Sequence, residues 1–138
     1  MNLKKNKSGF TLLEVIIVII IVGVLASLAL PRFFSTVEYS RATEAMQSIA
    51  SARQSIERCY LMTSDYQDCT SFATIDIDDP GTSPNAHFTY AITSGGPNAY
   101  TLTATRNTLD GGNGGTIVLT FNGTTITRSG TGPFGAVQ

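Results

Sequence analysis

The residues around Gly9 have the types and spacing of a processing and ion-pairing site. Three lysines precede Gly9, Phe10 follows it, and Glu14 comes four residues after Phe10. Cleavage after Gly9 would remove the basic leader and give Phe10 a free α-amino group. In a helix of 3.6 residues per turn, this amine and the Glu14 carboxylate lie about one turn apart. The spacing therefore predicts an ion pair, either within one chain or between neighbouring chains.

A long uncharged stretch follows Glu14. No charged residue occurs from Val15 to Leu30, and about twenty residues separate Phe10 from Pro31. A helix of that length spans about 30 Å, the thickness of the hydrocarbon core of a bilayer. A carboxylate in this layer costs about 2.5–3.5 kcal/mol on insertion scales, so Glu14 is a functional-site candidate. The leader lysines predict a cytoplasmic N-terminus and a translocated remainder.

Together these residues resemble the N-terminal signature of type IV pilins and of type II secretion pseudopilins. The resemblance rests on the basic leader, GFTLLEV, the apolar run and Pro31, over about a fifth of the chain. It implies that a prepilin peptidase cuts after Gly9 and methylates Phe10, and that Glu14 is the assembly carboxylate. A generic single-span anchor with an incidental glutamate is the alternative, but it does not explain the order of these residues.

The apolar segment 10–31 also contains two residues that weaken helices. Gly23 lowers helix propensity, and Pro31 lacks a backbone donor and disfavours helical geometry at Leu30. In the family that the chain resembles, this proline kinks the long helix. We expect a kink or a locally unwound turn between Gly23 and Pro31, which could stretch inside a filament.

Four segments follow the predicted leader (1–9) and membrane helix (10–31). Within the exposed domain, 32–138, we expect an amphipathic helix (32–60), a connection (61–85), four antiparallel strands (86–128) and a loose tail (129–138) in which Phe134 tacks onto the sheet. A stripe of small and aliphatic residues at spacings of three and four marks the buried face of the helix. The stripe comprises Ala42, Ala45, Ile49, Ala52, Ile56 and Cys59. The predicted fold class is α+β, with the long helix packed on a four-stranded sheet.

The strands are predicted from apolar residues at alternate positions. Apolar residues alternate with threonines around Tyr90, Leu102 and Leu119, and Asn122-Gly123 is a strong hairpin signal. His87, the only histidine, is interpreted as an ordinary residue at the start of a strand. On the helix, the spacings Glu38/Arg41, Arg41/Glu44 and Arg53/Glu57 predict side-chain ion pairs.

Cys59 and Cys69 are the two cysteines, and an exported domain meets an oxidising compartment. They predict one disulfide, worth about 2.5–3 kcal/mol in the chain-entropy treatment. A metal-binding thiolate pair is the competing reading. Asp76, Asp78 and Asp79 could bind Ca²⁺ through oxygen ligands, but they lack EF-hand spacing, so a solvated acidic turn is favoured.

Composition bears on partners and on catalysis. Removing the three leader lysines takes the formal charge from −1 to −1 − 3 = −4, before the new amine is counted, and leaves six scattered arginines. No basic run predicts specific nucleic-acid binding, although weak binding by an assembled filament is not excluded. No catalytic set, phosphate loop or metal quartet is present in the sequence, so we expect neither enzymatic activity nor a cofactor.

The expected function is that of a structural subunit of a type IV pilus-like filament. The resemblance implies a precursor in the bacterial inner membrane, partners in the prepilin peptidase and the assembly machinery, and polymerisation of many copies through the N-terminal helix. The filament would then span the periplasm or reach the cell exterior. A pseudopilin of a secretion or DNA-uptake system is the second hypothesis, and a membrane-anchored binding module the third.

Overall fold

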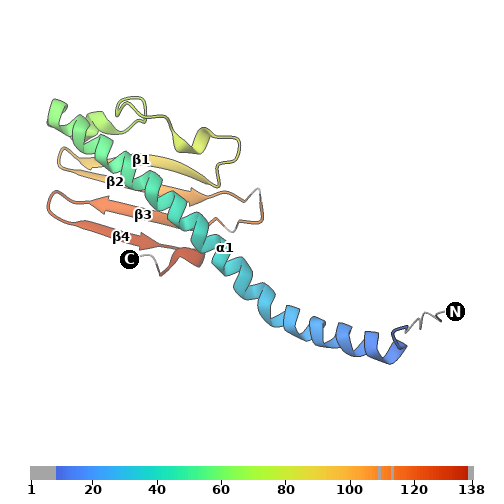
Figure 1. Ribbon diagram of the computed structural model, residues 1–138. Helices are drawn as coiled ribbons and strands as arrows, with labels where there is room; N and C mark the ends of the chain where they lie inside the picture. The colour runs from blue at the N-terminus through green and yellow to red at the C-terminus, as the bar shows by residue number, and fades with distance from the viewer. Residues whose placement is uncertain (1–8, 109, 113, 137–138) are drawn as a thin grey trace, which may run out of the picture. The chain divides into compact units, whose positions relative to one another are not determined.

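A computed structural model describes residues 9–108, 110–112 and 114–136 (Figure 1). The chain forms one long helix, α1 (Leu12–Thr63), and four strands: β1 (Phe88–Gly96), β2 (Ala99–Arg106), β3 (Thr116–Phe121) and β4 (Ile126–Gly130). Three short 3-10 helices are η1 (Tyr66–Cys69), η2 (Pro80–Thr82) and η3 (Gly132–Phe134). The predicted leader lies outside the described residues except for Gly9. The chain divides into two compact units, Met1–Thr36 and Val37–Gln138.

Helix α1 is helical throughout, including Gly23 and Pro31. The locally unwound turn expected between these residues is therefore absent from the described chain, although Pro31 still deprives the helix of one backbone donor. A kink at this place, and stretching of the segment in a filament, stay predictions. The helix also runs on to Thr63, three residues past the predicted end at Tyr60.

The sheet of the second unit is the predicted antiparallel meander, in the order β1-β2-β3-β4 (Figure 1). Its register pairs Ile92 with Leu102 and Leu102 with Leu119, so that apolar side chains of neighbouring strands share one face. The opposite face carries a threonine at many of the alternate positions. This confirms the α+β fold and the alternation that predicted it.

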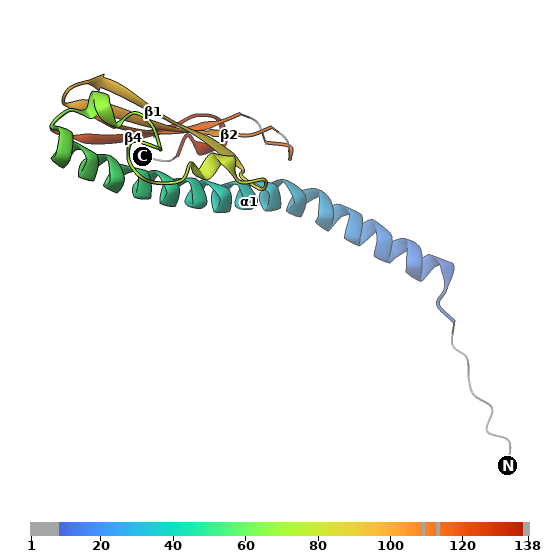
Figure 2. The same cartoon turned by 90° about the horizontal axis from the view of Figure 1, so that it is seen from above.

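The helical stripe and the apolar face of the sheet form one core in two layers (Figure 2). Ser55 is buried on the helix, and so are all six predicted stripe residues: Ala42, Ala45, Ile49, Ala52, Ile56 and Cys59. Ala45 and Ala104 are completely buried, because small side chains let the helix approach the sheet closely. Phe134 is fully buried as well, which confirms that it tacks onto the sheet.

The connections differ in detail from the prediction. β1 extends to Gly96 with an irregularity between Ser94 and Gly96, and only a tight turn separates it from β2. The β3–β4 connection is a four-residue loop, because Phe121 pairs with Ile126. The Asn122 side chain accepts hydrogen bonds from the backbone N–H groups of Thr124 and Thr125. These bonds stabilise the four-residue loop in place of the two-residue turn that Asn-Gly predicts. The segment 129–138, predicted as a loose tail, instead contains the last two residues of β4 and the whole of η3.

Candidate functional site

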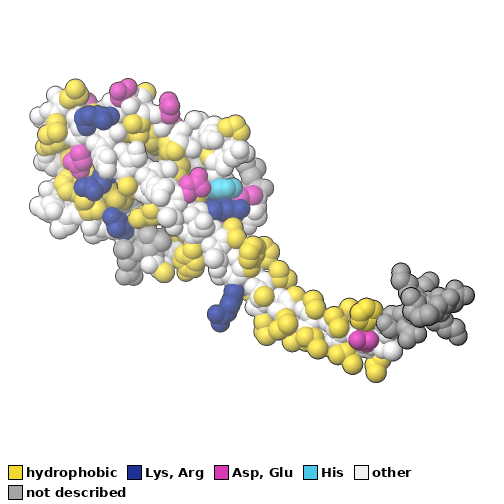
Figure 3. Space-filling view, viewed as in Figure 1, with side chains coloured by type: hydrophobic (Ala, Val, Ile, Leu, Met, Phe, Trp, Pro, Cys, Tyr) yellow, Lys and Arg dark blue, Asp and Glu magenta, His cyan; other side chains and the backbone are white. Residues whose placement is uncertain are grey.

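The N-terminal unit presents an apolar surface. Every described residue from 9 to 36 is exposed, and the ring of Phe10 is 82% exposed. Hydrophobic side chains cover this part of α1, interrupted near its start by one acidic side chain (Figure 3). By length and composition α1 is able to cross a membrane, and the most apolar part of it has no burial within the chain. Such a surface requires lipid or other helices around it.

The start of α1 gives Glu14 a second role that the sequence reasoning missed. Thr11 precedes the helix, and its hydroxyl oxygen accepts a hydrogen bond from the backbone N–H of Glu14 at 3.2 Å. The Glu14 carboxylate also lies in the first turn, where the partial positive charge of the helix N-terminus stabilises an anion. The spacing Thr-x-x-Glu is the signal of a capping box and was available in the sequence.

Gly9 and Gly23 have no packing reason to be glycine in this structure. A Cβ atom at either position would meet no heavy atom within 4 Å, and neither has a positive φ. Whatever requires a small residue there therefore acts outside the isolated fold. Gly9 and Phe10 directly precede the capping residue Thr11, so the predicted new N-terminus would lie next to the first turn of α1.

The predicted disulfide between Cys59 and Cys69 is present, with a Cα–Cα distance of 6.1 Å. It joins the last turns of α1 to the end of η1, where Cys69 is buried. The metal-binding alternative for these two residues is therefore excluded in the folded chain. Tyr66, the first residue of η1, also packs into the core, so η1 is anchored at both of its ends.

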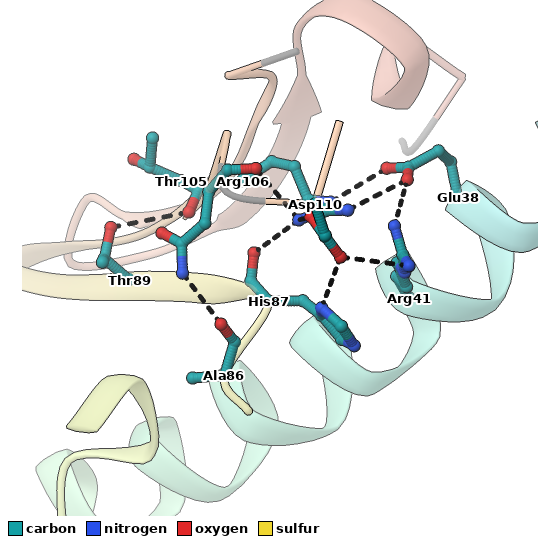
Figure 4. A network of polar contacts seen from close by, with 9 residues as sticks. Glu38, Arg41, Ala86, His87, Thr89, Thr105, Arg106 and Asp110 are labelled. Atoms are coloured by element: carbon teal, nitrogen blue, oxygen red, sulfur yellow. Dashed lines mark hydrogen bonds and ion pairs between the residues drawn. The ribbon is translucent and has the colours of Figure 1, made fainter. Parts of the chain in front are cut away.

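An ion network that the sequence reasoning did not predict joins α1 to the end of β2 (Figure 4). The Arg106 side chain has no exposed surface. Its guanidinium donates to both Glu38 oxygens, at 3.0 and 3.1 Å, and to Asp110 Oδ1 at 2.8 Å. Arg41 contacts Glu38 at 2.7 Å, as predicted, but its second partner is Asp110 and not Glu44. His87 Nδ1 lies 2.9 Å from Asp110, so this histidine belongs to the network.

Two features of the sequence point to this network in hindsight. The alternation Tyr100, Leu102, Ala104 continues to Arg106, which places a charged side chain on the buried face of β2. Gly112 then gives the guanidinium room, because a Cβ there would lie 2.9 Å from its central carbon. A buried charge needs paired partners; Glu38 supplies one from 68 residues away, and Asp110 supplies the other from four residues along the chain.

The network shifts the ionisation of both carboxyl groups in the same direction. Hydrogen bonds from Arg106 hold the pKa of Glu38 below its ordinary value of 4.5. Hydrogen bonds from the same guanidinium, together with the charges of Arg106, Arg41 and His87, lower the pKa of Asp110 to about 2. Both groups therefore stay ionised well into the acid range, as partners of a buried cation must.

We predict from these shifts that the folded chain loses stability in acid. Because the folded pKa values lie below 4.5 and 3.8, the stability from both groups is complete above about pH 5 and is lost as the pH falls toward 2. Thermal unfolding of the detergent-solubilised full chain measures this loss of stability. The melting temperature should be followed from about pH 6 to about pH 2, the range in which carboxyl groups titrate. Asp110→Asn should flatten this dependence, and an unchanged profile in that variant would contradict the assignment.

A second polar cluster, centred on the partly buried Glu57, lies at the other end of the sheet. Glu57 accepts hydrogen bonds from the hydroxyls of Tyr66 at 2.8 Å and Tyr100 at 3.0 Å. Burial and these bonds raise the pKa of both tyrosines. The predicted Glu57–Arg53 ion pair is not among the ion pairs of the described residues, and Arg53 Nε is buried without a hydrogen-bond partner among them.

The acidic connection is built as a turn. Asp79 accepts a hydrogen bond from the backbone of Gly81 at 2.8 Å and so caps η2, and Asp76 adopts a positive φ of 57°. Among the described residues, no group of three histidine, cysteine or acidic side chains is arranged to hold a metal ion. The calcium reading of Asp76, Asp78 and Asp79 thus gains no support from this geometry.

Comparisons with known protein families cover most of the chain. The model of a family described as "Type IV minor pilin ComP, DNA uptake sequence receptor" matches residues 31–115. The model of the prokaryotic N-terminal methylation motif matches residues 4–30. The second match contains Gly9, Phe10 and Glu14, and the first contains the ion network and the disulfide.

Individual relatives each match less than half of the chain. The chain is 34% identical over 67 residues to the type IV major fimbrial protein FimA of Dichelobacter nodosus, which covers 49% of this chain and 43% of that protein. It is 39% identical over 54 residues to the type II secretion system core protein G of Aeromonas hydrophila, covering 39% and 38%. These alignments span less than half the length of either relative. No solved structure matches the chain significantly.

Proposed function

Because the chain belongs to the family of the type IV minor pilin ComP, we propose that it acts as a subunit of a type IV pilus-like filament after removal of its leader. The precursor would wait in the inner membrane with α1 spanning the bilayer. A prepilin peptidase would cut after Gly9 and methylate the amine of Phe10, and the assembly machinery would then move the helix from lipid into a bundle of identical or similar helices.

One observation carries this proposal: a single carboxylate in an otherwise uncharged, fully exposed apolar helix. From Phe10 to Pro31 Glu14 is the only ionisable side chain, and this part of α1 is exposed along its whole length among the described residues. In a helix bundle, the Phe10 amine of a neighbouring subunit is a cation able to compensate Glu14 in an apolar layer. The pair would set the axial register of the helices, while contacts between apolar side chains supply most of the interaction. This role is structural and requires no catalysis.

The cleavage site gives the first test. Gly9→Val should leave uncut precursor in the membrane, because a peptidase that accepts glycine next to the scissile bond has little room for a branched side chain. Intact mass measurement should find a mature wild-type chain that begins at methylated Phe10.

Gly23→Ala is the matched control, since Gly23 has the same open surroundings as Gly9. This variant should be cut normally. Mature-length protein from Gly9→Val would show that Gly9 is not the cleavage residue, and a native chain that keeps its first nine residues in assembled filaments would overturn the proposal.

A pseudopilin role is the alternative that the likeness to core protein G favours. Both roles use the same N-terminal chemistry, so Glu14 and Gly9 do not distinguish them. The composition of purified surface filaments distinguishes the two roles. Mass spectrometry should find the proposed pilin in these filaments, whereas a pseudopilin would be confined to short periplasmic assemblies. A monomeric binding module would be in neither.

The matched family is described as a DNA uptake sequence receptor, which favours a second function, binding of DNA during its uptake. The arginines available for phosphates are few, because Arg41 and Arg106 are held in the ion network and Arg58 donates to Ser55 and the backbone of Ile75. Arg53 and Arg128 are left in the second unit.

We therefore expect DNA affinity that depends weakly on salt. With two or three phosphate contacts, a plot of log K against log salt concentration should have a slope of about −2 to −3. Fluorescence anisotropy with labelled duplex DNA, at salt concentrations bracketing the physiological value, measures the slope. Arg128→Ala should make it shallower by about one unit. A much steeper slope would require a basic surface that these arginines do not provide.

A further inference from the structure

A hollow of about 390 Å³ lies where two hairpin loops meet the end of α1. One wall comes from the last turns of the helix and η1, and the other from the β1–β2 turn and the β3–β4 loop. Its lining residues are Tyr60, Tyr66, Asn98, Phe121, Asn122, Gly123 and Thr124. The hollow lies within the second unit and does not overlap the ion network at the opposite end of β2.

The floor of the hollow is aromatic and rigid. Tyr60 stacks on Tyr66 with ring centroids 4.2 Å apart, and Phe121 meets Tyr66 edge-on at 5.8 Å. Tyr66 is only 4% exposed, and its hydroxyl donates a hydrogen bond to Glu57. Tyr60 and Phe121 are half-buried. Two partly exposed rings therefore rest on a buried one, and their orientation is set before any ligand arrives.

The rim supplies two oriented amide groups. Asn122 Oδ1 accepts hydrogen bonds from the backbone and hydroxyl groups of both Thr124 and Thr125, at 2.9–3.2 Å. Asn98 Oδ1 accepts a hydrogen bond from the Tyr60 hydroxyl at 3.4 Å. With both oxygens engaged, each NH₂ end has no acceptor among the described residues. The two loops also lie close together, since a Cβ at Gly123 would be 3.2 Å from the Asn98 carbonyl oxygen.

This combination points to one class of ligand. None of the seven lining residues carries a charge, so a phosphate or carboxylate would find no counter-charge in the hollow. Flat aromatic faces suit the C–H face of a sugar ring, and amide N–H groups suit its hydroxyl oxygens. Four of the lining residues, from Phe121 to Thr124, also lie beyond the residues that match the DNA uptake sequence receptor family.

We propose that this hollow binds a neutral saccharide, with a sugar ring against Tyr60 and Phe121 and its hydroxyls accepting hydrogen bonds from Asn98 and Asn122. The proposal does not depend on filament assembly, because all the residues belong to one chain. A single-stranded nucleic acid, which also stacks on aromatic rings, is the rival occupant.

Nuclear magnetic resonance of the isotope-labelled full chain in a sugar-free detergent tests the proposal. The probes are the methyl glycosides of glucose, galactose, N-acetylglucosamine and N-acetylgalactosamine, and a short oligodeoxythymidine. At least one glycoside should shift the side-chain amide signals of Asn98 and Asn122 and the backbone amide of Gly123 in a saturable way. Signals of the ion network should not move.

Two variants make the test specific. Tyr60→Leu keeps an apolar side chain in the stack but removes the ring, and should weaken binding about tenfold or more. Tyr39→Leu removes a half-exposed tyrosine of the same helix outside the hollow and should leave binding unchanged. The absence of saturable shifts with all four glycosides overturns the proposal, as do equal effects of the two variants. Shifts produced by oligodeoxythymidine alone overturn it in favour of nucleic acid.

Discussion

Replacing Glu14 with alanine is expected to abolish filaments while leaving the protein in the membrane and correctly cut. Removal of the carboxylate makes insertion easier, by about 2.5–3.5 kcal/mol on insertion scales, so a defect in membrane entry is not expected. In the bundle, however, the Phe10 amine of the neighbouring subunit would lose its counter-charge in an apolar layer. Filament yield, measured by shearing and electron microscopy, should fall by about tenfold or more, the effect of about 1.4 kcal/mol per contact.

The structure adds an alternative that this experiment must separate. Glu14 also lies in the first turn of α1, beside the cap that Thr11 provides, so a loss of filaments from Glu14→Ala could reflect a frayed helix start. Glu14→Gln keeps a polar side chain of the same shape in the first turn but removes the charge. Thr11→Ala removes the cap hydroxyl, at a cost of about 1 kcal/mol, and keeps the charge.

The two controls should therefore diverge. If the charge pairs with a neighbouring amine, Glu14→Gln fails to assemble and Thr11→Ala assembles. The opposite pattern would assign Glu14 to helix capping and would remove the basis of the proposed assembly mechanism. Normal insertion and cleavage in all three variants, read from membrane fractions and intact mass, is required before the filament yields are compared.

Replacing Arg106 with methionine is expected to have the largest effect on the stability of the folded domain. The guanidinium is completely buried and bonded to two carboxylates and two backbone carbonyls, of His87 and Asn107. Methionine fills part of the volume but leaves Glu38 and Asp110 without their main cation. Breaking such a pair costs about 3–5 kcal/mol, which is a large fraction of the stability of a small domain. Urea unfolding of the detergent-solubilised full chain, followed by circular dichroism, measures the loss.

Arg128→Met is the matched control, because Arg128 is exposed on β4 and its side chain forms no ion pair among the described residues. It should change the stability by no more than about 0.5 kcal/mol. The double variant Arg106→Met/Glu38→Met should recover part of the loss, since it also removes the partly buried carboxylate that has lost its main cation. Equal effects of Arg106→Met and Arg128→Met would mean that the network contributes no more than an ordinary surface arginine.

Local patterns predicted the regular elements well. The spacing of Ala45, Ile49 and Ile56 identified the buried face of α1, and the alternation in β1 to β3 identified the inner face of the sheet. The disulfide followed from the presence of only two cysteines and from the expectation that the domain is exported. The helix and strand inferences succeeded because their periods are properties of neighbouring residues in the sequence. The disulfide inference succeeded because two cysteines allow only one pairing and an oxidising compartment favours it.

Element boundaries were less well predicted. The Asn-Gly signal predicted a two-residue turn, but four hydrogen bonds to the Asn122 side chain favour a longer loop. Helical structure through Gly23 and Pro31 likewise exceeds the expectation from propensity, because one missing donor does not end a helix whose other backbone bonds persist. In both places an energy of one or two hydrogen bonds decides between alternatives that look alike in the sequence.

The sequence by itself predicted an apolar helix with one acid that is long enough to cross a membrane, an α+β domain after it, and the family signature at Gly9, Phe10 and Glu14. Only the tertiary structure decided the partners of the buried polar groups: Arg106 with Glu38 and Asp110, His87 with Asp110, and Glu57 with two tyrosines. The physical reason is sequence distance. Arg106 and Glu38 are 68 residues apart, and no local period relates them, so their contact exists only once the helix has packed across the sheet.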